Sequence, residues 1–148
     1  MSSTIIPMIP CSAEGPLGIR HLPRLWLKVS LESTGRLHPD YPGIGQGFDM
    51  MVINGLGLSA DAVRSFIADN HPSYAEFEAW VKTQPGAKLD RASVTQLNTS
   101  IMAYHHDDDT RKGILDAAGY PDDGSVAGSA TELNAIEDWA AFHASVLK

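Results

Sequence analysis

Residues 103–113 (AYHHDDDTRKG) place two histidines directly before three aspartates, residue types that bind metal ions or transfer protons. Successive side chains on a helix point about 100° apart, so adjacent residues cannot converge on one ion. The helix dipole favours His105 and His106 in the last turn of one helix and the aspartates at 107–109 in the first turn of the next. We therefore predict a junction between two helices here and no metal site, with metal binding and acid–base catalysis as alternatives.

Lys28 lies in the most apolar segment of the chain, residues 20–36 (RHLPRLWLKVSLESTGR). Arg24 lies four residues before it and Glu32 four residues after it, so the three share one stripe of a helix. We favour a narrow solvated edge that is stabilised by an i,i+4 ion pair. The alternative is an ammonium group that faces a pocket and binds a carboxylate or takes part in acid–base chemistry.

Two further residues are candidates for proton transfer. Asp49 follows Phe48 and precedes a short predicted helix, which makes an N-cap the default interpretation. A general base beside Lys28 is the alternative. His143 lies on the apolar seam of the last predicted helix, one turn after Trp139. Such a histidine is usually a satisfied core residue, but a buried imidazole is also the best general base that the chain offers.

Apolar residues recur at helical spacing along most of the chain, and the alternating pattern of strands is rare. In the first such segment Leu22, Leu25, Trp26 and Val29 stand at positions i, i+3, i+4 and i+7. Further leucines widen this apolar surface, which indicates a central, buried helix. The pattern predicts about seven helices, over residues 20–35, 49–57, 60–70, 73–82, 92–106, 109–119 and 129–148.

Capping residues mark the ends of several predicted helices. Ser59 precedes one helix, and Ser73 and Ser129 are each followed three residues later by glutamate, the pattern of a capping box. Gly35 and Gly119 follow the last apolar residues of two other helices, as C-terminal glycines commonly do. We therefore expect an all-α fold, a single compact domain with an irregular or orthogonal bundle of helices.

The segment 38–47 (HPDYPGIGQG) is rich in proline and glycine and predicts a loop. Tyr41 lies in this loop, either as a packed aromatic in a turn or as part of a pocket wall. The GIGQG glycines lack the preceding strand and the following Lys-Ser/Thr pair of a phosphate-binding loop, so we expect a turn.

Charge and length limit the classes of function. The net charge is -7 and no basic run occurs, which argues against nucleic acid and anionic membranes as partners. The 148 residues suit one domain, and we expect an N-terminal extension at 1–15 followed by a helical domain at 16–148. The extension does not resemble a signal peptide, and we predict a cytoplasmic protein. The single cysteine, Cys11, cannot form a disulfide within the chain, and we interpret it as a small residue of that extension.

Several motifs together resemble a bacterial family catalogued as domain of unknown function 5069, over residues 16–147. They are Leu22-Pro23-Arg24 with Lys28, Gly35 and Leu37, Tyr41, Gly47-Phe48-Asp49, LGLS at 56–59, YAEFEAWV at 74–81 and LNAIEDWAAFHA at 133–144. Many members of this family carry an acid directly before the lysine, where this chain has Leu27. The resemblance implies no established activity, but it strengthens Lys28, Asp49, Trp139 and His143 as candidate site residues.

We expect a small enzyme that works without a cofactor, in a pocket between the first helix, the 38–47 loop and the last helix. Lys28 or Arg24 would hold an anionic or carbonyl group of a small-molecule substrate. Asp49 or His143 would move a proton in a hydrolysis, an elimination or an isomerisation. Four aromatic residues would form the apolar walls: Trp26, Tyr41, Phe48 and Trp139. The alternative is a non-catalytic ligand-binding or protein-interaction domain, including a homodimer.

Overall fold

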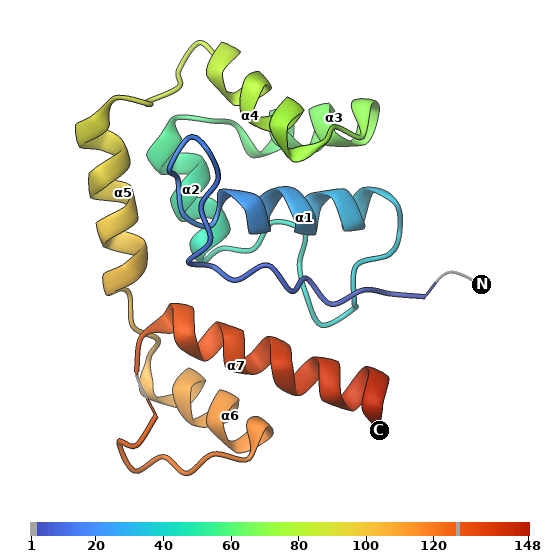
Figure 1. Ribbon diagram of the computed structural model, residues 1–148, viewed down its shortest axis with the longest axis vertical. Helices are drawn as coiled ribbons and strands as arrows, with labels where there is room; N and C mark the ends of the chain where they lie inside the picture. Colours follow the sequence, from blue (N-terminus) through green and yellow to red (C-terminus); the bar gives the residue numbers. More distant parts are fainter. Residues whose placement is uncertain (1–2, 127) are drawn as a thin grey trace.

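The computed structural model describes residues 3–126 and 128–148 (Figure 1). Among these residues there is no strand, only three isolated β-bridges, and the predicted all-α class is therefore confirmed. The α-helices of this part of the chain are α1 (Leu22–Ser33), α2 (Phe48–Leu56), α3 (Ala60–Asn70), α4 (Tyr74–Thr83), α5 (Arg91–Ala103), α6 (Asp108–Ala118) and α7 (Ala130–Phe142). A short π-helix, η1 (His143–Leu147), continues α7.

The helices α1 and α2 lie in the middle of the molecule, between α3 and α4 at one end and α7 toward the other (Figure 1). α3 and α4 pack on α1, and α5 packs on α2. α6 and α7 form a pair at the opposite end of the molecule from α3 and α4, and α7 also contacts α5. The result is an irregular bundle in which α1 has neighbours on several sides.

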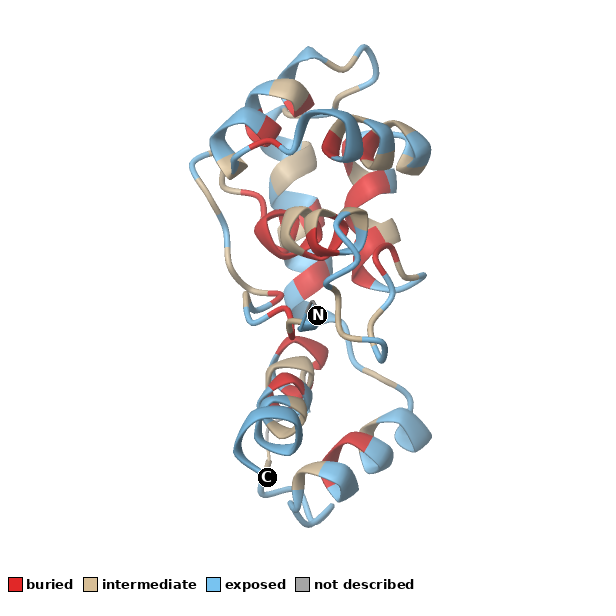
Figure 2. Ribbon diagram, turned by 90° about the vertical axis from the view of Figure 1, so that its right-hand side faces the viewer, coloured by how far each residue is buried: buried red, intermediate tan, exposed pale blue. Residues whose placement is uncertain are grey.

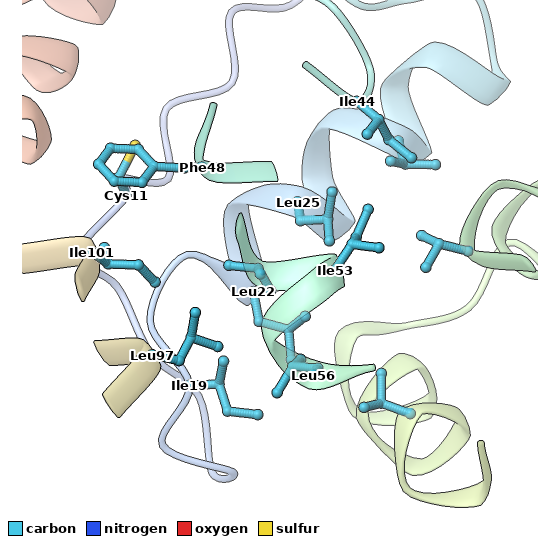
Figure 3. Close-up of a cluster of buried hydrophobic side chains, with 14 of the residues drawn as sticks. Cys11, Ile19, Leu22, Leu25, Ile44, Phe48, Ile53, Leu56, Leu97 and Ile101 are labelled. Atoms are coloured by element: carbon cyan, nitrogen blue, oxygen red, sulfur yellow. The ribbon is translucent and has the colours of Figure 1, made fainter. Parts of the chain in front are cut away.

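The buried apolar side chains form two separate clusters. The main core lies around α1 and α2 (Figure 3) and includes Leu22, Leu25, Ile53, Leu56 and Ile101. The minor core lies between α6 and α7 and contains four buried side chains: Ile114, Leu115, Leu133 and Ile136. In Figure 2 the buried residues are concentrated in the larger part of the molecule, while α6 is mostly exposed. Hydrophobic stabilisation is therefore divided unequally between the two parts.

The helices end where the capping residues predict. The hydroxyls of Ser59 and Ser73 accept hydrogen bonds from the first turns of α3 and α4, and Glu76 completes the capping box of α4. Asp107 caps α6 in the same way. Gly119 ends α6 with a φ of 83°, a left-handed conformation that glycine adopts without strain. Local sequence therefore fixes most of the helix boundaries.

Residues 3–15, which the sequence suggests as an extension, pack against the helical domain. Ile5 bridges to Leu37, the residue before the 38–47 loop. The guanidinium of Arg24 on α1 donates to the carbonyl oxygens of Pro7 and Ile9, at 2.7 and 2.9 Å. This segment lacks helical periodicity, so the sequence gives no sign that an arginine on α1 holds it in place.

The apolar seam predicted for the last helix is only partly buried. Leu133 and Ile136 belong to the minor core, but His143 and Leu147 are exposed. The expected burial of His143 is therefore wrong, because the residue lines an open hollow between the ends of α6 and α7. None of the helices in residues 3–126 and 128–148 combines the length and apolarity that a membrane crossing requires.

Candidate functional site

Asp49 is the central residue of a buried polar cluster, and only 3 % of its surface is exposed. Its Oδ1 lies 2.7 Å from Nε2 of His21, and its Oδ2 lies 2.5 Å from Nζ of Lys28. The backbone N–H of Gly45 donates to Oδ2 at 2.8 Å. The predicted N-cap role is wrong, because Gly47 occupies the N-cap of α2 and the Asp49 side chain bonds to α1. The geometry agrees with the alternative interpretation, in which Asp49 is a carboxylate beside Lys28.

The neighbours of Asp49 hold it in its ionised form. Burial alone would raise the pKa of this carboxyl group. The hydrogen bond and charge of His21, together with the charge of Lys28, outweigh burial and lower the pKa of Asp49 to about 2. Asp49 is therefore a permanent negative charge at neutral pH, and it can orient its partners without giving up a proton.

Lys28 is 6 % exposed, so the predicted solvated edge is wrong. Its expected partner, Glu32, pairs instead with Arg64 of α3, with 3.2 Å between Nε and Oε1. Lys28 forms its ion pair with Asp49 on α2, from the buried face of α1. A lysine directed into the protein matches the alternative interpretation, and the carboxylate that it binds belongs to the chain itself.

His21, for which we predicted no role, is the N-cap of α1 and is almost completely buried. Its φ of 70° is uncommon for a residue with a side chain, and such strain clusters at functional sites. Burial would lower the pKa of His21, but its interactions with Asp49 and Cys11 raise it. A signal existed in the sequence, because His21, Arg24 and Lys28 stand at i, i+3 and i+7, on one face of a helix.

Arg24 and Asp138 form a second buried ion pair, which links α1 to α7. Nη1 lies 2.7 Å from Oδ2 and Nη2 lies 3.1 Å from Oδ1, the bidentate arrangement of the strongest such pairs. The Tyr41 hydroxyl donates to Oδ1 at 2.9 Å. Burial and the Asp138 charge raise the pKa of Tyr41, so the phenol stays protonated. Both terminal nitrogens of Arg24 bind Asp138. Arg24 is therefore better placed to hold α7 against α1 than to bind a substrate.

The two ion pairs border one cavity with a volume of ≈ 260 Å³. Helix α1, the 38–47 loop, the start of α2 and α7 all contribute to its walls. Five residues selected from the sequence meet here: Arg24, Lys28, Tyr41, Phe48 and Asp49. The cavity is also lined by Cys11, His21, Asp40, Pro42, Gly45, Gln46, Gly47, Asn134 and Glu137.

Cys11 is 1 % exposed, and Figure 3 places it with Phe48 at one edge of the main core. Nδ2 of Asn134 lies 3.5 Å from its Sγ. Burial would raise the pKa of the Cys11 thiol, but the interactions with His21 and Arg24 lower it below its ordinary value. We interpreted Cys11 as a residue of an extension. The sequence around Cys11 does not indicate that His21, Arg24 and Asn134 lie beside it in the fold.

Three predicted site residues lie outside the cavity. Trp26 donates from Nε1 to the Pro72 carbonyl at 3.0 Å and packs edge-on against Tyr74 at the opposite side of α1. Trp139, which is 57 % exposed, lines a separate hollow with His143 between the ends of α6 and α7. His143 therefore cannot act on a group bound beside Asp49.

The histidine–aspartate stretch separates α5 from α6, which confirms the predicted junction. α5 ends at Ala103, and Asp107 caps α6, so His105 and His106 lie between the helices and not in a last turn. Nε2 of His106 lies 2.8 Å from Oδ1 of Asn134, whose amide nitrogen contacts Cys11. In the part of the chain that the structure describes, no group of three histidine, cysteine or acidic side chains has the arrangement of a metal site.

No family model, curated protein or solved structure matches this chain. The resemblance to domain of unknown function 5069 therefore stays a prediction. Any functional conclusion depends on the cavity, where a buried histidine hydrogen-bonded to a carboxylate has the geometry of a general base.

Proposed function

We propose that the protein is a small enzyme without a cofactor, which moves protons in the cavity beside Asp49. Its reaction would be a hydrolysis, an elimination or an isomerisation of a small polar organic substrate. The observation that carries the proposal is the buried His21–Asp49 pair, 2.7 Å apart, on the wall of a cavity. A carboxylate that orients an imidazole is a recurring arrangement in acid–base catalysis.

The hydrogen bond to Asp49 determines which nitrogen of His21 exchanges protons. An ionised carboxylate only accepts, so Nε2 of His21 carries a hydrogen and donates it. Nδ1 is then the atom that takes or gives a proton. Nδ1 is buried, and none of the described residues makes a hydrogen bond to it. The raised pKa of His21 strengthens this nitrogen as a base.

Glu137 offers a second group for proton transfer in the same cavity. Glu137 is an exposed residue, and the partial burial of its carboxyl group together with the neighbouring Asp138 raises its pKa. A carboxyl group and an imidazole that line one cavity can act as the acid and the base of a reaction. The small volume of the cavity, ≈ 260 Å³, suits a substrate of a few carbon atoms.

A substrate screen with variants of His21 and Asp49 tests this proposal. The panel contains small esters, amides, hydroxy acids and carbonyl compounds. We expect the wild type to convert at least one of them, and His21→Asn and Asp49→Asn to lower kcat/KM by at least about 100-fold. Asparagine tolerates the left-handed backbone at position 21, which makes it the suitable replacement there.

The control variant is Asp116→Asn, which changes an exposed carboxylate on α6 and leaves the cavity unchanged. It should keep the wild-type kcat/KM, and thermal melting should show that all variants are folded. A wild type that converts none of the compounds, or a His21→Asn variant that is as active as the wild type, would contradict the proposal.

A further inference from the structure

We propose that Cys11 is a catalytic nucleophile, and that His21 and Asp49 complete a thiol–imidazole–carboxylate triad with it. The substrate would be a small acyl compound, an ester or a thioester, whose acyl group is transferred to the sulfur. This inference rests on the proposed function, because it uses the same proton-transfer nitrogen of His21. It adds a covalent step and names the class of substrate.

The surroundings of Cys11 differ from those of a cysteine that only fills space. Such a cysteine has apolar neighbours and is inert. Cys11 belongs to the main core. Its sulfur also contacts the amide of Asn134, and the residue lines the cavity together with His21 and Arg24. Two cationic side chains beside a thiol stabilise its thiolate. A buried position with a polar, cationic face toward a cavity is suited to a nucleophile.

His21 supplies the second and independent observation. It is 2 % exposed, its Nε2 is occupied by Asp49, and its Nδ1 is buried without a hydrogen bond to any described residue. A buried nitrogen without a hydrogen bond costs free energy, and a catalytic role is one explanation for retaining it. Cys11 and Asp49 both raise the pKa of this ring, and Cys11 lines the same cavity as His21. In a free enzyme, the hydrogen bond between a general base and its nucleophile is often long or poorly aligned, and it shortens when the substrate binds.

The proposed reaction balances in two steps. The Cys11 thiol gives its proton to Nδ1 of His21, and the thiolate attacks the carbonyl carbon of the substrate. A carbon–sulfur bond forms, the bond to the leaving group breaks, and the imidazolium returns the proton to the leaving group. Water then attacks the thioester carbon while His21 takes a proton from it. The carbon–sulfur bond breaks, the acid leaves, and the imidazolium returns the proton to the sulfur of Cys11.

The start of α2 would stabilise the negative charge that develops on the carbonyl oxygen. The first amides of a helix have no partners within the helix, and α2 has no side chain that caps it. Gly45, Gln46 and Gly47 bring this helix start to the cavity wall. Amides directed at a developing oxyanion are among the strongest contributions to catalysis of acyl transfer.

The first test is alkylation of the full-length native protein with iodoacetamide, followed by mass spectrometry. Because Cys11 is the only cysteine, every modified molecule reports on this thiol. We expect the rate at about pH 6 to be within a few-fold of the rate at about pH 9, since the thiolate persists at the lower pH. In His21→Asn the rate at about pH 6 should fall at least about tenfold.

An ordinary tenfold rise in rate per pH unit in the native wild type would overturn the inference, as would a thiol that reacts only after denaturation. The wild-type profile by itself decides this point if His21→Asn does not fold. The second test is incubation with p-nitrophenyl acetate, which should add one acetyl group to the wild type and none to Cys11→Ala. Acetylation of both proteins to the same extent would also overturn the inference.

These tests separate the nucleophile from the proposed function. Substrate conversion that persists in Cys11→Ala but is lost in His21→Asn would keep the acid–base enzyme and remove the nucleophile. A wild-type thiol that reacts at about pH 6 and is acetylated, without turnover of any substrate, would keep the nucleophile and contradict the enzyme.

Discussion

Asp49 shows how one carboxylate can determine the state of a whole cluster. It accepts from the side chains of His21 and Lys28 on α1 and from the backbone of Gly45 in the loop. The removal of one member of a buried ion pair leaves the other charge without compensation, which is strongly unfavourable. Asp49 therefore supports both the fold and the protonation of the proposed base. For any substitution of Asp49, both the stability and the activity of the variant have to be measured.

The lowered pKa of Asp49 predicts a loss of stability in acid. The unfolded carboxyl group has a pKa near 3.8 and the folded one about 2, so the unfolded chain binds the proton more readily. The stabilisation of the fold by ionised Asp49 is complete above the pKa of the unfolded chain, and it is lost as pH falls toward 2. Urea unfolding should show that the wild type loses about 2 kcal/mol more than Asp49→Asn between about pH 5 and about pH 2. Equal losses in the two proteins would mean that Asp49 is not held in its ionised form.

At the scale of elements, local patterns predict the helices well and their buried faces less well. Ser59, Ser73 and Gly119 act within a few residues of themselves, so the sequence predicts the ends that they form. The burial of Lys28 and Arg24 depends on partners 21 and 114 residues away. Nothing in a single helix reveals such partners, and an i,i+4 pattern suggests a solvated edge instead. The site was therefore predicted in part: Arg24, Lys28 and Asp49 were selected, whereas Cys11 and His21 were missed.

Two glycines, one at the end of a helix and one inside another helix, predict opposite effects of substitution by alanine. Gly57 ends α2 with a φ of 73°, and an added Cβ would lie 2.2 Å from the carbonyl oxygen of Gly86. Gly57→Ala should therefore lower the free energy of unfolding by at least about 2 kcal/mol. Gly113 lies inside α6 with open space around it, so Gly113→Ala should raise that free energy by about 0.5–1 kcal/mol. Urea unfolding checks both, and a Gly57→Ala variant as stable as the wild type would contradict the proposed constraint.

At the scale of the whole molecule, the cavity lies where the two cores meet. Its α1, loop and α2 walls belong to the part that contains the main core, whereas Asn134 and Glu137 come from α7. The bidentate pair of Arg24 and Asp138 joins the two parts beside the cavity. A movement of α7 relative to α1 would therefore change the surroundings of Cys11 and open the cavity, without any change in the main core.

The unequal cores predict that the molecule opens in stages. The four buried side chains of the minor core give α6 less hydrophobic stabilisation than α1 and α2 receive from the main core. In native-state hydrogen exchange, the α6 amides should exchange through an opening of low free energy, and the α1 and α2 amides only near global unfolding. The α7 amides should be intermediate, because Asp138 ties α7 to Arg24. Ile114→Ala should speed exchange in α6 and leave α2 unchanged, while Ile53→Ala, its matched variant in the main core, should lower protection in every helix. The same opening free energy in α6 and α2 would show instead that the two cores unfold as one unit.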